Sequence, residues 1–567
     1  MLTCGRSSAR AAVPIAALLL AACATPPGPD VPPRLAAAKG APLQLCTELP
    51  GRLSLPNTVI ASATVVPAGG LAGVGQPIAE HCLVVGRMNE RVSPVDGQSY
   101  AIGFQMRLPK DWNGRFFPQG NGGLDGFVAN AVGIASGGRV QTNALAMGFA
   151  VLSSDAGHTP RQLPLFGRDP QARLDYGYAA VGSLTPMARQ LISAAYGKAP
   201  DRSYFGGCSN GGRHAMVAAS RYAADYDGIL AGNPGFNLPK AAVAQLYGAQ
   251  QFATVTTSDD LASSLAPDER RLLAERILAR CDALDGLADG MVQDTAACQS
   301  TFDLQRDVPT CSGPRVGSCL NAAQKGVLSR IFTGPNDASG GKLYSSFPFD
   351  PGIAAPDWAG WKFVSSITNR DPVAVAFVFQ TPPAPAEAAS APRAFAMAFD
   401  AARDGAKIFA TDATYTESSM QFMTPPNADD LSPLKRRGAK LMVYHGVADG
   451  VFSADDTAAW YRRLQARHGG DASNFSRLFL VPGMNHCASG PSADQFDMLT
   501  PLVDWVEKDI PPDRVTAQVR GPGHAAPNAD VPEGWARDRT RPLCPYPRVA
   551  RYKGSGDRER AESFECR

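Results

Sequence analysis

The sequence predicts an α/β fold in which two separated parts of the chain build one core. Short apolar runs broken by turns fill the first half, and a strand, a sharp glycine-flanked turn and a helix follow one another around residue 209. The strand pattern resumes after residue 425. Between residues 237 and 425 the chain is instead helical, cysteine-bearing and proline-rich, so we interpret this stretch as an inserted lid domain.

The overall composition limits the possible partners. Fifty-four basic side chains stand against fifty-two acidic ones along 567 residues, which leaves a formal net charge of +2. This balance gives no net field that would attract nucleic acid or an anionic membrane surface. We therefore expect no nucleic-acid partner, and the sequence does not specify an oligomeric state.

The N-terminus predicts export. A basic stretch precedes an apolar run, residues 11–22, that is too short to span a bilayer. The run ends in Leu-Ala-Ala-Cys23, which resembles the lipobox of bacterial lipoproteins, whose cysteine is acylated. We expect residues 1–22 to be a lipoprotein-type signal peptide and residues 23–40 a flexible, proline-rich tether. The protein is then anchored at the outer membrane. The alternative is an ordinary signal peptide with a chance cysteine and a periplasmic or secreted protein.

The first part of the expected core spans residues 41–236. Its predicted strands are 81–88, 100–109, 114–120, 148–158 and 202–207. A helix is predicted over residues 176–196, before the last of these strands, and another follows Ser209. Strand, sharp turn and helix around Ser209 are typical of a nucleophile elbow.

The pattern Gly207-Cys208-Ser209-Asn210-Gly211 at this turn predicts a nucleophilic serine. A serine hydroxyl needs a base, and the base needs an orienting carboxylate; in α/β-hydrolases they follow in the chain order Ser, Asp, His. Asp449 and His486 end the predicted strands "LMVYHGVAD" and "LFLVPGMNH" in the second part of the core, residues 426–567, which also holds an irregular C-terminal extension. We predict that Ser209, His486 and Asp449 form a catalytic triad.

Two alternatives to this triad remain open. Asp455 and Asp456 are rival carboxylates, but "SADDTAAW" is typical of a helix N-cap and first turn, where negative charge is favoured by itself. A buried histidine and a solvated aspartate are also common at strand ends, so Asp449 and His486 could have no catalytic role.

The cysteine count predicts disulfides. Of the twelve cysteines, Cys4 leaves with the signal and Cys23 carries lipid, and the even remainder in an oxidising compartment indicates five bonds. If Ser209 and His486 come within hydrogen-bond reach, their neighbours Cys208 and Cys487 are forced together. We therefore predict a Cys208–Cys487 disulfide that ties the elbow to the histidine loop. The alternative is two buried free thiols.

Two further motifs are candidate sites. Backbone N–H groups of Asn210 and of Gly122 or Gly123 in "GNGG" are candidate oxyanion donors, unless these glycines only form a turn. The segment "CDALDGLADGM" crowds three aspartates between glycines, and crowded carboxylates repel unless a hard cation bridges them. The ordinary alternative for this segment is a solvated acidic helix end.

A cysteine beside the serine and another beside the histidine resemble the tannase and feruloyl esterase family, which includes members that cleave mono(2-hydroxyethyl) terephthalate. The resemblance covers nearly the whole mature chain through "GNGGLDG", "YFGGCSNGGRHAM", "CDALDGLADG", "YTESSMQFM", "YHGVADGVFSADDTAAWY" and "VPGMNHC". It implies an α/β-hydrolase core interrupted by a lid. It also implies a serine carboxylic ester hydrolase that cleaves small aromatic esters, such as feruloyl or galloyl esters, through an acyl-enzyme. Terephthalate monoesters are the alternative substrates.

The same resemblance implies a structural calcium ion in the lid, held by Asp282, Asp285 and Asp289 and by the main-chain carbonyls of Leu287 and Met291. It also pairs the remaining cysteines as Cys46 with Cys82, Cys281 with Cys298, Cys311 with Cys319, and Cys544 with Cys566.

Lid side chains are the expected contacts of the aromatic acyl group. The candidates are Trp358, Trp361, Phe377 and Phe379, and the alternative is that they form the core of the lid. The terephthalate-cleaving relatives hold a free carboxylate with a lid arginine. Arg370 follows Trp361 here but does not align clearly with that arginine, which weakens the terephthalate alternative.

Two other classes of protein compete with an esterase. A catalytically silent envelope lipoprotein would show a broken triad or oxyanion loop, and this sequence shows neither. A metal-dependent hydrolase would need ligand clusters such as H-E-x-x-H, which are absent from the sequence.

Overall fold

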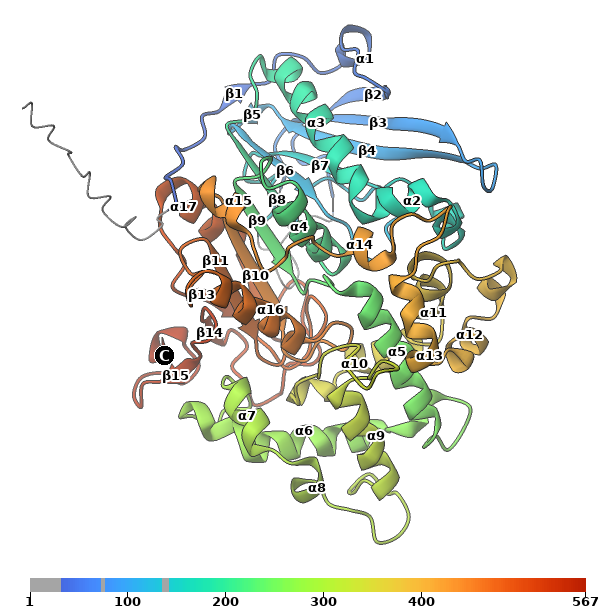
Figure 1. Ribbon diagram of the computed structural model, residues 1–567. Helices are drawn as coiled ribbons and strands as arrows, with labels where there is room; N and C mark the ends of the chain where they lie inside the picture. The colour runs from blue at the N-terminus through green and yellow to red at the C-terminus, as the bar shows by residue number, and fades with distance from the viewer. Residues whose placement is uncertain (1–31, 73–76, 135–141) are drawn as a thin grey trace, which may run out of the picture. The chain divides into compact units, whose positions relative to one another are not determined.

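The core of the protein is a nine-stranded sheet with the strand order β11-β10-β9-β8-β6-β7-β4-β3-β2. It is seen in a computed structural model that describes residues 32–72, 77–134 and 142–567 (Figure 1). Strands β7, β6, β8, β9, β10 and β11 run parallel, whereas β4, β3 and β2 pair antiparallel. The strands are β2 (Thr58–Val66), β3 (His81–Val92), β4 (Ser99–Pro109), β6 (Arg115–Gln119), β7 (Ala150–Ser154), β8 (Arg202–Cys208), β9 (Gly228–Gly232), β10 (Lys440–Gly446) and β11 (Ser476–Val481).

Helices cover both faces of this sheet. Phe205 on β8 lies in one hydrophobic cluster with α4 and α16, while its neighbour Tyr204 lies in another with α17. Because the central strands are buried on both faces, their sequences are nearly continuous apolar runs. The covering helices are α3 (Ala180–Tyr196), α4 (Asn210–Arg221), α16 (Ala454–Arg467) and α17 (Leu499–Lys508).

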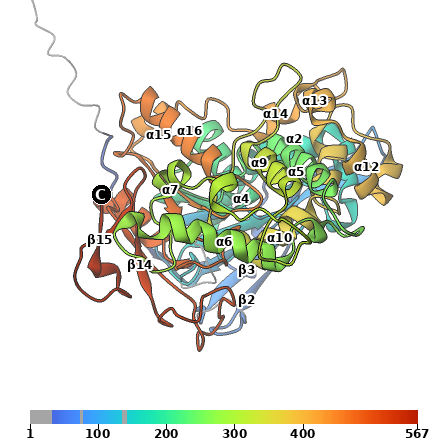
Figure 2. The same cartoon turned by 90° about the horizontal axis from the view of Figure 1, so that it is seen from below.

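A long helical segment separates β9 from β10 and contains the expected lid. Figures 1 and 2 show most of its helices gathered at the end of the sheet where the parallel strands finish, whereas the last one, α15, lies just before the start of β10. No strand of the nine-stranded sheet lies in its described residues. Its helices are α5 (Leu238–Ala253), α6 (Pro267–Cys281), α7 (Thr295–Thr301), α8 (Leu304–Asp307), α9 (Ala322–Thr333), α10 (Pro356–Ala359), α11 (Asp371–Val373), α12 (Pro392–Ala398), α13 (Ala401–Asp404), α14 (Ser419–Met423) and α15 (Ser432–Arg436).

The C-terminal extension packs against the lid. It forms a three-stranded antiparallel sheet and a two-stranded one. Arg539 and Arg551 donate to the carbonyl oxygens of Asp289 and Leu284 at 2.8 and 2.9 Å. The strands are β12 (Gln495–Phe496), β13 (Val515–Gln518), β14 (Thr540–Leu543), β15 (Ala550–Tyr552) and β16 (Phe564–Cys566).

The expected fold class, an α/β-hydrolase core with an inserted lid, is confirmed by this architecture. The helix expected over residues 176–196 begins with a wider π turn, Asp175–Ala179, and continues as α3. Strands β2 and β9 were not expected. β9 is only five residues long and is bounded by glycine at both ends, so it gives little periodicity.

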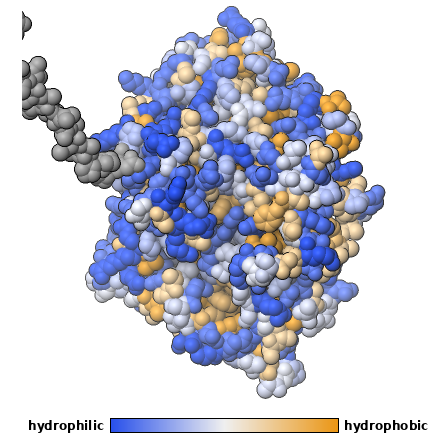
Figure 3. Space-filling model, viewed as in Figure 1, coloured by the Kyte–Doolittle hydropathy of each residue, from blue (hydrophilic) through white to orange (hydrophobic). Residues whose placement is uncertain are grey.

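The expected signal peptide and Cys23 lie outside the described residues. Within the described residues, no helix is both long and apolar enough to cross a membrane. The face drawn in Figure 3 intersperses polar residues with smaller apolar areas.

Candidate active site

Ser209 lies at the sharp turn between β8 and α4. Its backbone has φ 65° and ψ −126°, a conformation that is rare for a residue with a side chain and that is often found at functional sites. The turn presses against the loop after β6: a Cβ placed on Gly207 would lie 2.6 Å from the carbonyl oxygen of Gly120 and 2.9 Å from the Cα of Gly211. Close packing of backbone on backbone therefore requires glycine on both sides of the serine.

Ser209, His486 and Asp449 form one line of hydrogen bonds. The Ser209 hydroxyl lies 2.7 Å from Nε2 of His486, and Nδ1 of His486 lies 2.8 Å from Oδ2 of Asp449. A carboxylate at Nδ1 favours the tautomer with its proton there, which leaves Nε2 free to accept the serine proton. This geometry can generate a serine nucleophile.

The environment of Asp449 keeps it ionised. Burial alone would raise the pKa of this carboxyl, but His486 and His445 outweigh burial and hold its pKa well below its usual value. The backbone N–H groups of Val451 and Phe452 donate to Oδ1 at 2.7 and 3.1 Å. The Asn233 side chain donates to Oδ2 at 2.7 Å. Asp449 is thus fixed in position as well as in charge.

The structure contains all five expected disulfides. The Cys208–Cys487 bond joins the residue before Ser209 to the residue after His486, with Cα atoms 6.1 Å apart. It covalently links the end of β8 to the loop after β11, through two cysteines that lie 279 residues apart in the chain. The rival carboxylates take other roles: Asp455 and Asp456 lie in the first turn of α16, where Ser453 is the N-cap.

The four aromatic lid candidates occupy different places. The Trp361 ring lies 5.0 Å from the His486 ring, centre to centre. In contrast, Phe377 and Phe379 are fully buried, and Trp358 packs edge to face on Phe363. These three contribute to the hydrophobic core of the lid, which includes the buried face of α5.

Two residues that were not expected to contact the triad also lie at this edge of the site. Phe452 follows Asp449 by three residues, and its ring lies 5.4 Å from the His486 ring, centre to centre. The Arg370 guanidinium lies over the Trp361 ring at 4.9 Å and over the Phe452 ring at 5.6 Å. Nothing in the sequence placed Arg370 near the histidine, because the contact joins the lid to the core.

Behind Asp449, buried polar groups connect the lid to the acid. Gln245 on α5 donates to the carbonyl oxygens of Gly450 and Val451 at 2.9 and 2.8 Å. Its own side-chain oxygen accepts a hydrogen bond from Lys362 at 3.3 Å. Burial lowers the pKa of Lys362 to about 7. A single lysine in a lid helix gives no sequence signal for this position.

The loop with the candidate oxyanion donors lies directly after β6. Gly123 has φ 64°, and its carbonyl oxygen accepts a hydrogen bond from the Tyr176 hydroxyl at 3.1 Å. A Cβ at Gly122 would meet no atom within 4 Å, so this glycine borders open space. Asn210 is the first residue of α4, where backbone N–H groups have no partner within the helix.

The acidic loop follows α6. Asp282 accepts backbone N–H groups of Asp289 and Gly290 at 3.0 and 2.8 Å, and Asp289 also pairs with Arg541. Burial raises the pKa of Asp285 to about 7, and the charges of Asp289 and Asp282 add to this effect. Carboxylate and carbonyl oxygens are the donors that calcium takes. Among the described residues, no three or more His, Cys, Asp or Glu side chains form a group that could hold a metal.

The family model for tannase and feruloyl esterase matches residues 82–567 of the chain. The protein belongs to this family. It is 39% identical to mono(2-hydroxyethyl) terephthalate hydrolase of Piscinibacter sakaiensis over 91% of this chain and 90% of that one. It is 28% identical to a probable feruloyl esterase B of Emericella nidulans over 92% of this chain and 94% of that one. Membership of this family makes the protein a carboxylic ester hydrolase.

Solved structures share the fold. Feruloyl esterase B from Aspergillus oryzae superposes with a TM-score of 0.72 at 24% identity, covering 92% of this chain and 99% of that one. Another esterase from Aspergillus oryzae gives 0.73 at 23% identity with the same coverage.

Replacing Cys208 and Cys487 together by serine should lower kcat about tenfold or more, because a displacement of about 1 Å in a catalytic group can cost about a hundredfold. The matched control replaces Cys311 and Cys319, which close a short loop within the lid. We expect the control to lower the melting temperature with little change in kcat. Wild-type kcat in the Cys208 and Cys487 variant, measured on folded protein, would contradict a positioning role for this disulfide.

Proposed function

We propose that the protein is a serine hydrolase that cleaves esters of aromatic acids through an acyl-enzyme. The observation that carries the proposal is the hydrogen-bonded line from Ser209 through His486 to Asp449. Ser209 Oγ attacks the ester carbonyl carbon while its proton moves to His486 Nε2. The carbon–oxygen bond to the alcohol then breaks, and His486 returns the proton to the departing alcohol. Water attacks the acyl-enzyme by the same route and releases the acid.

The tetrahedral intermediate needs donors for its negative oxygen. We assign this role to the backbone N–H of Asn210 and to that of Gly122 or Gly123, since these groups belong to the two loops that meet beside Ser209. A helix N-terminus at Asn210 adds a favourable dipole for the developing charge.

The proposed acyl groups are phenolic acids such as ferulic or gallic acid. Trp361 and Phe452 both contact the His486 ring, so flat apolar surfaces border the place where the acyl group reacts. Names of relatives that include feruloyl esterase point to the same class of substrate.

Terephthalate monoesters are the second candidate, and Arg370 is the observation that favours them. Its guanidinium lies over both aromatic rings that contact His486, close enough to the site to meet an anionic end of a substrate. Asp371 already pairs with Arg370, so part of its charge is compensated. The 39% identical relative is named for hydrolysis of such a monoester.

We further propose a structural calcium ion in the lid and export to the cell envelope. The closeness of Asp282, Asp285 and Asp289 along one short loop supports the ion, with the carbonyls of Leu287 and Met291 as the proposed additional donors. When bound, calcium would neutralise these carboxylates and stiffen the loop. Five disulfides support an oxidising compartment, with Cys23 as the proposed lipid anchor.

The purified protein should hydrolyse methyl ferulate or methyl gallate faster than a short aliphatic ester, and Ser209→Ala should abolish all of these activities. Release of the free acid, followed by chromatography, measures this directly. Absence of turnover on every aromatic ester, by protein with its fold and disulfides intact, would instead favour a silent binding lipoprotein.

Arg370→Leu should raise KM for mono(2-hydroxyethyl) terephthalate about tenfold or more, because a charge-assisted contact contributes about 1.5–3 kcal/mol. KM for the neutral ester methyl ferulate serves as the internal control and should change little. Equal changes in KM for the two esters would rule out recognition of a carboxylate by Arg370.

Removal of calcium with a chelator should lower the melting temperature by a few degrees, because a bound ion stabilises only the folded state. Added calcium should restore it, and magnesium should not. In Asp285→Asn the melting temperature should no longer respond to either treatment. An unchanged melting temperature of the wild-type protein in chelator and in excess calcium would refute the ion.

A further inference from the structure

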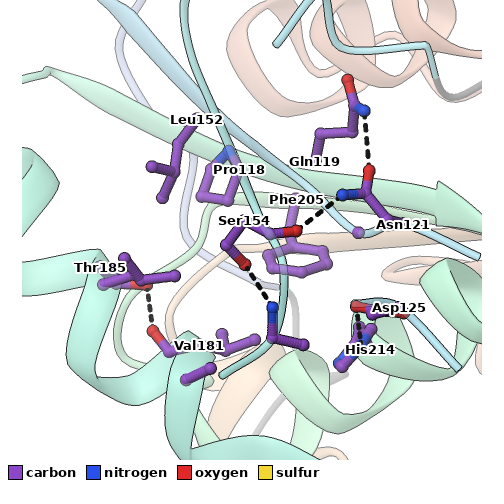
Figure 4. Close-up of a pocket in the computed structure, with 14 residues that line it drawn as sticks. Pro118, Gln119, Asn121, Asp125, Leu152, Ser154, Val181, Thr185, Phe205 and His214 are labelled. Atoms are coloured by element: carbon purple, nitrogen blue, oxygen red, sulfur yellow. Dashed lines mark hydrogen bonds and ion pairs between the residues drawn. The ribbon is translucent and has the colours of Figure 1, made fainter. Parts of the chain in front are cut away.

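A buried carboxylate joins the glycine-rich loop after β6 to the first turn of α4. Asp125 is 4% exposed and comes from "GNGGLDG". Its Oδ1 accepts a hydrogen bond from the Asn210 side chain, and its Oδ2 lies 3.2 Å from Nε2 of His214. Figure 4 shows Asp125 pointing at His214, beside a small cavity that the loop and α3 enclose. The catalytic sequence described above makes no use of this group.

The side chain of Asn210, which donates to Asp125, is also held by hydrogen bonds within α4. Its side-chain oxygen accepts a hydrogen bond from Nε of Arg213 at 2.7 Å. Arg213 is fully buried and donates to the carbonyl oxygens of Tyr176 and Gly177 at 2.9 and 2.8 Å. Rotation of the Asn210 side chain would therefore break several buried hydrogen bonds at once.

The loop on the other side depends on Asp125. Asp125 has φ 47°, a left-handed conformation that costs a non-glycine residue free energy, and its N–H donates to the carbonyl oxygen of Gly122 at 3.1 Å. The carboxylate thus lies at the end of the turn that contains Gly122 and Gly123. Strain at this residue is offset by the contacts that its side chain makes with α4.

We propose that Asp125 is a positioning residue that sets the distance between the two oxyanion donors, one on the glycine-rich loop and one at Asn210. This inference rests on the proposed function, because only a tetrahedral intermediate needs both donors. Oxyanion donors act only when they lie at about 2.7–3.1 Å from the charged oxygen. A charged hydrogen-bond acceptor in a buried site holds that distance more firmly than a neutral one.

His214 fits the same role. Burial, followed by the neighbouring charge of Arg213, lowers the pKa of His214. Its Nε2 lies 3.2 Å from Oδ2 of Asp125 and 3.2 Å from the side-chain nitrogen of Asn210, so His214 contacts both members of the pair. The other titratable and charged groups around Asp125 are Arg213 on α4, Tyr176 before α3, and Asp155 and His158 in the loop after β7. Oδ1 of Asp155 accepts the backbone N–H groups of Gly103 and Gly157, both at 2.9 Å, whereas Asp125 is the carboxylate that contacts α4.

The test compares Asp125→Ala and Asp125→Asn with the wild-type protein on methyl ferulate. We expect Asp125→Ala to lower kcat about 10- to 100-fold with KM within about twofold, since loss of one oxyanion donor costs about 100- to 1,000-fold and misplacement less. Asp125→Asn keeps the size and one acceptor for Asn210, so its loss should be smaller. Affinity for phenylboronic acid, which forms a tetrahedral adduct on serine, should fall in parallel with kcat. Affinity for ferulate, which does not, should stay unchanged.

The matched control is Asp227→Asn. Asp227 is as buried as Asp125 and accepts the backbone N–H of Ser203 at 2.9 Å near the start of β8, at the other end of that strand from Ser209. It should lower the melting temperature without changing the ratio of phenylboronic acid affinity to ferulate affinity. If Asp125→Ala does not fold, the ratio of phenylboronic acid affinity to ferulate affinity is measured on Asp125→Asn and on Asn210→Ala instead. Both variants should lower this ratio, and their effects should be non-additive in the double variant.

The possible outcomes distinguish failure of the proposed function from failure of the positioning role of Asp125. Wild-type protein that neither cleaves aromatic esters nor binds phenylboronic acid would overturn the proposed function. Active wild-type protein with unchanged kcat in both Asp125 variants would overturn the positioning role alone. Parallel losses of phenylboronic acid and ferulate affinity would also overturn it, because they indicate a general disturbance of the site.

Discussion

The hydrogen bond between Ser209 and His486 is the constraint on which the rest of the structure depends. It joins residues 277 positions apart at 2.7 Å, a distance that tolerates little movement of either loop. The parallel strands β8, β10 and β11 end at the same edge of the sheet and bring the three triad residues there. The Cys208–Cys487 bond then limits how far the serine and histidine loops can separate. Tight packing of Gly207 on Gly120 fixes the elbow from the other side.

The lid takes part in the site as well as covering it. Trp361 contacts His486, and Arg370 lies over Trp361. Further back, Gln245 donates to the carbonyl oxygens of Gly450 and Val451, and Lys362 donates to the side-chain oxygen of Gln245. A change in the position of the lid would therefore alter the contacts around Asp449 and His486 as well as those to a substrate.

The sequence predicted those residues of the site whose position depends on the order of strands and turns along the chain. Ser209, Asp449 and His486 were found because each ends or follows a strand, and the Cys208–Cys487 pair followed from their required proximity. Contacts between side chains of distant loops gave no such signal. Asp125, in the loop after β6, pairs with Asn210, at the start of α4, and no periodicity or spacing in the sequence connects these two residues. Among the lid aromatics, composition alone could not separate Trp361, at the histidine, from Phe377, in the core.

In the proposed mechanism, His486 activates Ser209 only in the folded protein. The most direct measurement is peptide mapping after brief treatment with a fluorophosphonate, which reacts with activated serines. We expect one adduct, on Ser209, that is lost when the protein is denatured first and is strongly reduced in His486→Ala. Labelling of another serine, or equal labelling of Ser209 in His486→Ala, would contradict it.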